Sequence, residues 1–151
     1  MARMHIRRKG KSSSTRPFRT VAPNWVEMNA DEIEDIIVKL AKKGESPSKI
    51  GIILRDNYGI PLARYFTKKK ITKSLEDKGI KFDIPEDMMN LIKRAVKIHN
   101  HLQENKKDMI SKRALQLTEA KIRRLVKYYI SRGKLPEGWK YTISSAKLLV
   151  R

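Results

Sequence analysis

Three side chains close together in the sequence are of the types that carry out acyl transfer. His101, Asp108 and Ser111 supply an imidazole, a carboxylate and a hydroxyl around one short segment between two helical patterns. A catalytic triad is built from these groups, but it also needs an exposed nucleophile on a tight turn and an oxyanion hole. The sequence around Ser111 has no glycine-rich turn and no candidate oxyanion hole. We therefore expect no acyl-transfer catalysis here.

Other catalytic and metal sites are also unexpected. The three histidines are His5, His99 and His101, and the last two are two positions apart, so on a helix they point to different sides. The chain has no cysteine, which excludes disulfides, thiol nucleophiles and cysteine-bound metals and is typical of a reducing, cytoplasmic compartment. An enzyme acting on RNA would need paired carboxylates for a metal, and none is evident. We predict neither a metal nor a cofactor, and place His99 in the core.

Asp108 and its neighbours are better suited to RNA. The shallow minor groove of RNA exposes the guanine amino group as a donor, together with ribose hydroxyls. An ionised Asp108 supplies an acceptor, while the flanking basic residues neutralise phosphates: Lys106, Lys107, Lys112 and Arg113. A structural interpretation is equally consistent, in which Asp108 caps the following helix and Ser111 bonds within its first turn. The two interpretations are compatible if the cap keeps lone pairs free for a base edge.

The charge balance points to a polyanionic partner. The 151 residues contain 35 Lys and Arg against 16 Asp and Glu, a net charge of +19, and nucleic acid is the leading candidate. With 40% hydrophobic residues the chain can still bury a core. The longest apolar run, residues 50–54, is far shorter than the roughly 20 residues of a membrane span. The N-terminus lacks the apolar segment of a secretory signal, so we expect neither membrane insertion nor export.

The first 20 residues form a basic segment without apolar periodicity. They contain no acidic residue, and seven are positively charged: Arg3, Arg7, Arg8, Lys9, Lys11, Arg16 and Arg19. Such a segment cannot repay the entropy cost of ordering alone, so we expect a disordered arm that binds RNA phosphates, with Arg7, Arg8, Lys9, Lys11 and Arg16 among its contacts. A solubilising tail is the alternative, and a nuclear address is only weakly indicated.

Three short helices are predicted after the arm. The first starts at a capping box of Asn29 and Glu32 and ends at Gly44. The second starts at Ser46, followed by a proline in the first turn, and ends at Gly59. The third is expected to start at a Thr67 cap, to carry Ile71 and Leu75, and to end at Gly79.

The second and third helices also allow a different class of function. Joined by the turn at residues 59–61, they could form a helix-turn-helix of a DNA-binding transcription factor. The third helix would then present lysines to a groove: Lys68, Lys69, Lys70 and Lys73. Lysines contact phosphates, and few base-reading side chains accompany them, so we rank this alternative second.

Two longer helices follow, and their patterns predict an antiparallel pair. The first carries an apolar stripe: Met88, Ile92, Ala95, His99 and Leu102. The second, over about residues 109–132, has an apolar half (Ile110, Ala114, Leu117, Ile122, Leu125, Val126 and Tyr129) and a basic half (Lys112, Arg113, Arg123, Arg124 and Lys127). The link at residues 105–108 is short enough to force the pair antiparallel. With a last helix from Ser144, the predicted fold is all-α.

Four aromatic residues are candidates for RNA contacts or for the core. Arg124 and Tyr128 are four positions apart at the boundary of the two halves, so together they offer a guanidinium and a phenol to a backbone and a base. Tyr129 lies in the middle of the apolar stripe and is expected in the core. Trp25 and Trp139 are each expected to pack a turn onto the core.

The segment HLQENKKDMISKRALQLTEAKIRRLVKYY, residues 101–129, closely resembles the centre of the small-subunit ribosomal protein fifteen family. The matching pattern is His101, Lys106, Lys107, Asp108, Ser111, Lys112, Arg113, Arg124 and Tyr128, with the family's spacing throughout. The arm and the first helices resemble the longer archaeal and eukaryotic form. The chain departs from bacterial members at Asn105, Met109 and Ile110, where they commonly have histidines, and at Ala114, where they have glycine.

The resemblance implies an all-helical, non-enzymatic protein of the small ribosomal subunit. It implies that His101, Asp108 and Ser111 read a minor-groove site with a G·U pair in the ribosomal RNA, and that Arg124 and Tyr128 hold a neighbouring three-way junction. It also implies contacts with other ribosomal proteins and with the large subunit. The expected organisation is a basic arm at residues 1–20, a helical subdomain at 21–66 and an RNA-binding helical domain at 67–151.

Overall fold

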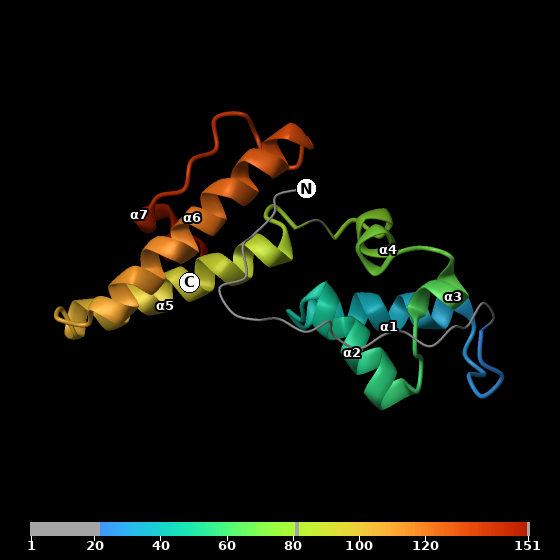
Figure 1. Ribbon diagram of the computed structural model, residues 1–151. Helices are drawn as coiled ribbons and strands as arrows, with labels where there is room; N and C mark the ends of the chain where they lie inside the picture. Colours follow the sequence, from blue (N-terminus) through green and yellow to red (C-terminus); the bar gives the residue numbers. More distant parts are fainter. Residues whose placement is uncertain (1–21, 81, 151) are drawn as a thin grey trace. The chain divides into compact units, whose positions relative to one another are not determined.

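The computed structural model describes residues 22–80 and 82–150, and all regular structure within these ranges is helical. The helices are α1 (Ala30–Lys42), α2 (Pro47–Tyr58), α3 (Ala63–Thr67), α4 (Ile71–Asp77), α5 (Glu86–Glu104), α6 (Met109–Ser131) and α7 (Ile143–Leu149) (Figure 1). The predicted all-α fold is confirmed. The chain divides into two compact units: an N-terminal unit that ends at Phe82 and contains α1 to α4, and a C-terminal unit that begins at Asp83 and contains α5 to α7.

The first two helices begin and end where the sequence predicts. The backbone N–H of Asn29 donates to Glu32 Oε2 at 3.1 Å at the start of α1. Ser46 Oγ accepts from the backbone N–H of Lys49 at 3.3 Å at the start of α2. Gly59 then ends α2 in the left-handed conformation, with φ at 66°, which only glycine adopts without strain. Local capping chemistry therefore determines both helices.

The core of the N-terminal unit lies between α1 and the helices that follow it. Its buried side chains are Ile33, Ile37, Leu40, Ile50, Leu54, Ile60, Ala63 and Leu75. Helix α1 contacts α2, α3 and α4, and α4 also contacts α2. Helix α4 is thus part of the N-terminal unit of the structure. The domain boundary expected between residues 66 and 67 stays a prediction.

The third predicted helix is wrong in its start. Thr67 does not cap it but ends an additional short helix, α3, and α4 begins only after Lys70. The reason is the direction of the threonine hydroxyl, which donates to the carbonyl of Ala63 at 3.2 Å and accepts from the N–H of Lys69 at 3.4 Å. These bonds make a turn, and Lys68 continues it with a positive φ of 58°. Residues 30–77 therefore hold four helices, one more than predicted.

This turn weakens the helix-turn-helix alternative. Lys68, Lys69 and Lys70 precede α4, so of the four lysines assigned to a recognition helix only Lys73 lies on it. Lys69 is further engaged by Asp77, whose Oδ2 lies 2.8 Å from Lys69 Nζ. A helix that presents one lysine is a poor reader of a DNA groove.

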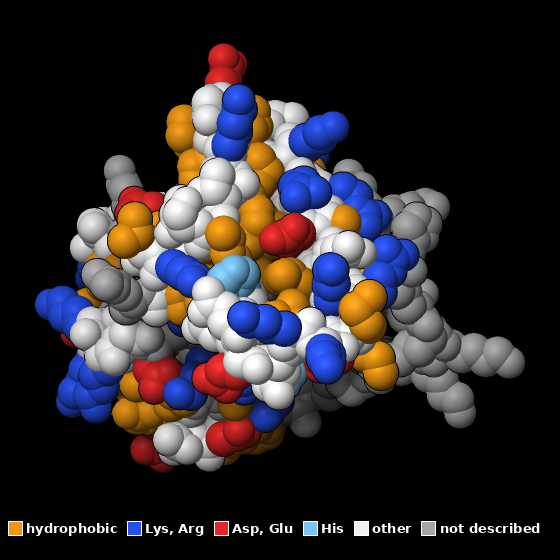
Figure 2. Space-filling model, turned by 90° about the vertical axis from the view of Figure 1, so that its left-hand side faces the viewer, with side chains coloured by type: hydrophobic (Ala, Val, Ile, Leu, Met, Phe, Trp, Pro, Cys, Tyr) orange, Lys and Arg blue, Asp and Glu red, His pale blue; other side chains and the backbone are white. Residues whose placement is uncertain are grey.

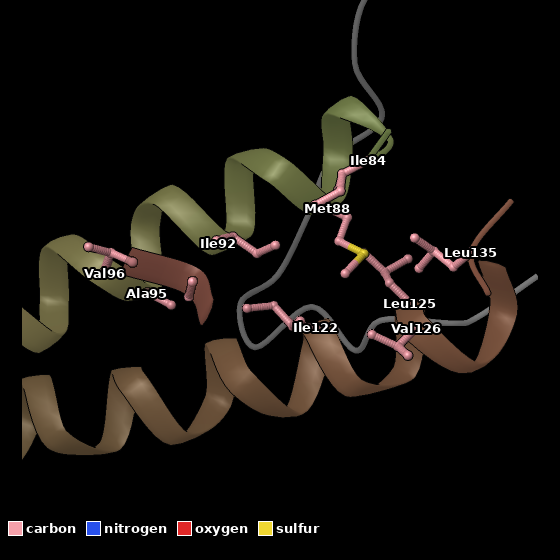
Figure 3. Packing of buried hydrophobic residues seen from close by; sticks show 10 residues of the cluster. Ile84, Met88, Ile92, Ala95, Val96, Ile122, Leu125, Val126 and Leu135 are labelled. Atoms are coloured by element: carbon pink, nitrogen blue, oxygen red, sulfur yellow. The ribbon is translucent and has the colours of Figure 1, made fainter. Parts of the chain in front are cut away.

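Helices α5 and α6 form the antiparallel pair expected from the sequence. The turn between them joins the end of α5 to the start of α6, and at the opposite end Tyr129 of α6 bonds to Asp87 of α5. Between these ends, apolar side chains of the two helices point toward one another (Figure 3). The buried cluster comprises Ile84, Met88, Ile92, Ala95, Val96, Ile122, Leu125, Val126, Leu135 and Ala146.

The last part of the chain closes over this pair. Gly133 ends α6 with φ at 65°. Thr142 caps α7, with Thr142 Oγ1 accepting from the N–H of Ser145 at 3.2 Å. Helix α7 contacts α5, and Trp139 and Tyr141 pack against the buried cluster. Over the described ranges, no helix combines the length and the apolar character that a membrane span requires.

Ile110 does not lie on the buried side of α6, where the sequence placed it. Its side chain is 85% exposed, whereas Ile122 is fully buried. The two positions are twelve residues apart, which places Ile110 about 120° away from Ile122 around an ideal helix. The buried side of α6 instead runs through Thr118, Ile122, Leu125 and Val126. Met109 is exposed as well.

Two further expectations are corrected in part. Trp25 does not enter the core: it is 61% exposed, and its Nε1–H donates to the carbonyl of Gly59 at 3.1 Å. The indole thus bonds to the end of α2 instead of packing on buried residues. His99 is half-buried on α5, and its Nδ1 is buried without a hydrogen-bond partner among the residues that the structure describes. Trp139 and Tyr129 pack against the core as predicted.

Candidate nucleic-acid interface

The turn between α5 and α6 brings together the three side chains that the sequence singled out. Asp108 is the N-cap of α6, and its Oδ1 accepts from the backbone N–H of Ser111 at 3.0 Å. Its other oxygen, Oδ2, lies 3.0 Å from Nε2 of His101, which projects from the last turn of α5. The antiparallel pairing of the helices places these residues side by side, although His101 and Ser111 are ten positions apart.

A fourth residue, Asn105, completes this group and was not assigned a role from the sequence. Its Nδ2 lies 3.3 Å from the backbone carbonyl oxygen of His101 and 3.3 Å from His101 Nδ1. The signal that could have found it is its spacing of four residues from His101, one helical turn. We call His101, Asn105, Asp108 and Ser111 the Asp108 cluster.

The cluster keeps Asp108 ionised. Hydrogen bonds from the side chain and the backbone N–H of Ser111, followed by the bond with His101, hold the pKa of the Asp108 carboxyl well below its usual range. The carboxylate is partly accessible, with 32% of the side chain exposed. At neutral pH the turn therefore presents a negative charge in the middle of positive ones.

The structural interpretation of Asp108 as a helix cap is confirmed. The carboxylate accepts from the backbone N–H and the side chain of Ser111, and its Oδ2 bonds to His101. An ionised carboxylate has about four lone-pair positions, so these three contacts leave acceptor capacity for a further group. The cap and the RNA interpretation are thus compatible.

Basic side chains surround the cluster. Lys106, Lys107, Lys112 and Arg113 are all exposed. Arg113 Nη1 donates to Gln116 Oε1 at 3.2 Å, and none of the four forms an ion pair within the described ranges. Residues 104–108 line a shallow open depression of about 450 Å³. Figure 2 shows the molecule from the side on which Figure 1 has this turn, and several blue Lys and Arg side chains are visible there. The surface is suited to a polyanion.

The second predicted contact pair lies further along α6. Arg124 and Tyr128 are both half-buried, one helical turn apart, and Arg124 Nε donates to the carbonyl of Ala120 at 3.3 Å. The ring of Tyr128 lies 5.2 Å from that of Tyr129 and tilted at 60° to it. The guanidinium of Arg132 lies over the Tyr128 ring, 5.7 Å from its centre.

Arg132 was not among the residues assigned to RNA from the sequence. It follows Tyr128 by four positions, as Tyr128 follows Arg124, so the spacing alone could have indicated it. Arg124, Tyr128 and Arg132 thus form a line along one side of α6. On the basic half of the same helix, Glu119 partly neutralises Arg123, with 3.4 Å between Oε2 and Nη2.

The five basic arm residues Arg7, Arg8, Lys9, Lys11 and Arg16 lie outside the described residues. Within residues 22–80 and 82–150, no three His, Asp or Glu side chains gather as a metal ion would require.

The chain is similar to known proteins over nearly its whole length. Residues 1–60 match the family model described as the ribosomal S13/S15 N-terminal domain, and residues 67–149 match that of ribosomal protein S15. The small ribosomal subunit protein uS15 of Methanocella arvoryzae is 50% identical over 150 residues, covering 99% of both chains. The uS15 protein of Methanoculleus marisnigri is 49% identical over 150 residues, which again cover 99% of both chains.

The two family models together account for nearly the whole chain, and the relatives match it from end to end. The Asp108 cluster and the Arg124 and Tyr128 pair lie within the second model's range. The family is one of structural proteins without enzymatic activity. The chain belongs to the ribosomal protein S15 family.

Proposed function

We propose that the protein is a structural component of the small ribosomal subunit that binds a three-way junction of the small-subunit ribosomal RNA and a neighbouring minor-groove site with a G·U pair. It supports subunit assembly and translation in the cytoplasm. The observation that carries this proposal is the Asp108 cluster, in which an ionised, partly exposed carboxylate stands among exposed lysines and arginines. The family membership supports the same function.

The cluster is suited to a minor groove for a chemical reason. A G·U or G·C pair presents the guanine amino group there as a donor, whereas an A·U pair presents acceptors. Asp108 offers acceptor lone pairs to that donor. Lys106, Lys107 and Arg113 lie beside it and neutralise phosphates that would otherwise repel the carboxylate.

The line of Arg124 and Tyr128 on α6 is suited to the junction. A guanidinium binds phosphate oxygens with two parallel hydrogen bonds, and an aromatic ring stacks on an unpaired base. Both groups stand on the same rigid helix as Ser111, so their separation from the Asp108 cluster is fixed. A fixed separation selects an RNA in which a minor groove and a branch point are equally far apart.

The rest of the protein has supporting roles in this proposal. The basic arm binds phosphates around the primary site, and the protein contacts other ribosomal proteins and the large subunit. Neither a cofactor nor a metal takes part.

The test compares two RNAs, one with the junction and its G·U pair and one a plain duplex of equal length. Asp108→Ala and Ser111→Ala should each weaken junction binding by about ten- to a hundredfold and duplex binding much less, the range that one base contact gives. Lys107→Ala should weaken both complexes alike, because it removes a phosphate contact. Isothermal titration calorimetry at fixed salt measures the affinities.

Two controls separate recognition from folding. Asp108→Asn keeps a good helix cap but removes the charge, and circular dichroism of each variant shows whether α6 is intact. Equal losses on both RNAs in the Asp108→Ala protein would mean that Asp108 acts only as a cap. A competition with DNA of the same sequence addresses the transcription-factor alternative, and chemical footprinting should show protection of the three-way junction.

A further inference from the structure

We infer that Asn105 is a positioning residue, whose side-chain amide holds the His101 ring in the tautomer that donates from Nε2 to Asp108 and so fixes the direction of the hydrogen bond between His101 and Asp108. The consequence for RNA binding rests on the function proposed above. The direction of the hydrogen bonds within the free protein does not depend on that function.

The orientation of the Asn105 amide follows from its two partners. The nitrogen Nδ2 lies 3.3 Å from the backbone carbonyl oxygen of His101, a group that only accepts hydrogen bonds. The atom facing this carbonyl must therefore be the NH₂ donor and not the amide oxygen. The same nitrogen has a second hydrogen and lies 3.3 Å from His101 Nδ1.

The tautomer of His101 follows in turn. Because Nδ1 accepts from Asn105, the neutral ring carries its hydrogen on Nε2. That nitrogen lies 3.0 Å from Asp108 Oδ2, so Nε2–H donates to the carboxylate. In the other tautomer, Nε2 would direct a lone pair at the carboxylate, which is repulsive.

The direction of the Ser111 hydrogen bonds follows from the charge of Asp108. Its backbone N–H donates to Asp108 Oδ1 at 3.0 Å, and its side chain also bonds to the carboxylate. An ionised carboxylate only accepts, so the Ser111 hydroxyl hydrogen is directed at Asp108 and leaves its oxygen lone pairs for an outside partner.

The cluster thus presents acceptors at both Asp108 and Ser111, while its donors are directed inward. Such a surface fits an amino group or a ribose hydroxyl and gives no partner to the acceptors that an A·U pair exposes in the minor groove. Asn105 contributes to this discrimination without contacting RNA. Removing its amide frees His101 Nδ1 and allows the second tautomer, in which the ring turns and Asp108 loses a partner.

The test uses Asn105→Ala in the full-length protein, with Asn100→Ala as a matched control because Asn100 is an exposed asparagine on α5, the helix that Asn105 ends. Long-range ¹⁵N–¹H NMR spectra at pH 8, well above the ordinary histidine pKa of about 6.5, report the tautomer of the neutral ring. A His101→Gln protein, which lacks the imidazole, identifies the NMR signals of the His101 ring. We expect the Nε2–H tautomer in the unaltered and Asn100→Ala proteins and a mixture of tautomers in Asn105→Ala.

Affinities for the two RNAs are measured in parallel. Asn105→Ala should weaken junction binding by about three- to tenfold and leave duplex binding unchanged. An unaltered tautomer in Asn105→Ala overturns the inference, whatever the RNA result. A changed tautomer with full junction affinity, in an assay where Asp108→Ala weakens binding, overturns the role of Asn105 in recognition. If Asp108→Ala also leaves junction affinity unchanged, the proposed function of the cluster fails, and with it the RNA consequence drawn for Asn105.

Discussion

The hydroxyl of Tyr129 donates to Oδ2 of Asp87 at 2.6 Å, across 42 residues of sequence. This bond joins the last turns of α6 to the first turn of α5. At the other end of the same pair, His101 of α5 bonds to Asp108 of α6. A carboxylate therefore links the two helices at each end, with the apolar cluster between them. This frame holds Ser111 and Tyr128 at a constant separation along α6.

Tyr129→Phe should lower the free energy of unfolding by about 1 kcal/mol at neutral pH, because it removes one hydrogen bond and keeps the ring in place. Urea denaturation followed by circular dichroism measures this. Tyr128→Phe is the control, since the Tyr129 hydroxyl remains. Equal stability of the Tyr129→Phe and unaltered proteins would show that the bond makes no net contribution.

The same residue predicts a dependence on alkaline pH. Burial, and then the bond with Asp87, raise the pKa of the Tyr129 phenol above its ordinary value of 10.0. A raised folded pKa means that the contribution is complete below pH 10 and is lost as pH rises further. The unaltered protein should therefore be more stable than Tyr129→Phe by a constant amount from neutral pH to about pH 9. This difference in the free energy of unfolding should decrease above pH 10. A difference that is the same at pH 8 and pH 11 would contradict this.

The contribution of Asp108 to stability should have the opposite pH dependence, at acid pH. Its bonds with Ser111 and His101 lower its pKa from the ordinary 3.8, so its contribution is present above about pH 4 and is lost as pH falls below that value. The unaltered protein should be more stable than Asp108→Asn near pH 5, and the two thermal midpoints should converge toward pH 2. Thermal melts of both proteins in low salt test this, and midpoints that stay equally far apart would refute it.

If Tyr128 binds the junction as proposed, Arg132 should contribute to junction binding, since its guanidinium lies over the Tyr128 ring. Arg132→Ala should weaken junction binding by about three- to tenfold, in keeping with the loss of one phosphate contact and a cation–π partner. Arg132→Lys should restore only the part of the junction affinity that depends on the positive charge. Duplex binding serves as the reference, and an unchanged junction affinity in Arg132→Ala would exclude the contact.

Deletion of residues 1–20 should flatten the salt dependence of RNA binding. Each neutralised phosphate contributes a slope of roughly −0.7 to −0.9 to log K against log salt, and the segment carries seven basic side chains. The slope is obtained from binding isotherms at several salt concentrations. Replacing the seven basic residues by Gln in the full-length chain controls for length. An unchanged slope in both variants would mean that the arm does not neutralise phosphates.

Much of the fold could be predicted because it depends on local chemistry. Asn29, Ser46 and Gly59 define helix ends through their own backbone and side-chain bonds, and all three were identified from the sequence. Thr67 was misassigned because its hydroxyl has two local choices, and only the turn formed by Lys68 and Lys69 decides between them. Ile110 was misassigned because its neighbours Ala114 and Leu117 suggested an apolar side that departs from the truly buried one.

Part of the candidate site could also be predicted from the sequence. His101, Asp108 and Ser111 could be brought together from the short link between two helices, and the structure confirms their proximity. The sequence indicates Asn105 and Arg132 only through their four-residue spacing from His101 and Tyr128, and this spacing does not show which atom each side chain faces. The Asn105 amide bonds to the backbone carbonyl and to Nδ1 of His101, and the Arg132 guanidinium lies over the Tyr128 ring. Residue type does not encode these three-dimensional contacts.

The bond from the Trp25 indole to the Gly59 carbonyl gives the N-terminal unit an optical reporter of its own. The chain has two tryptophans, and Trp139, the other one, packs in the C-terminal unit. Because one indole is exposed and the other half-buried, we expect them to differ in emission wavelength and in accessibility to a soluble quencher. Replacing either by phenylalanine thus makes the fluorescence of the remaining tryptophan report the unfolding of a single unit.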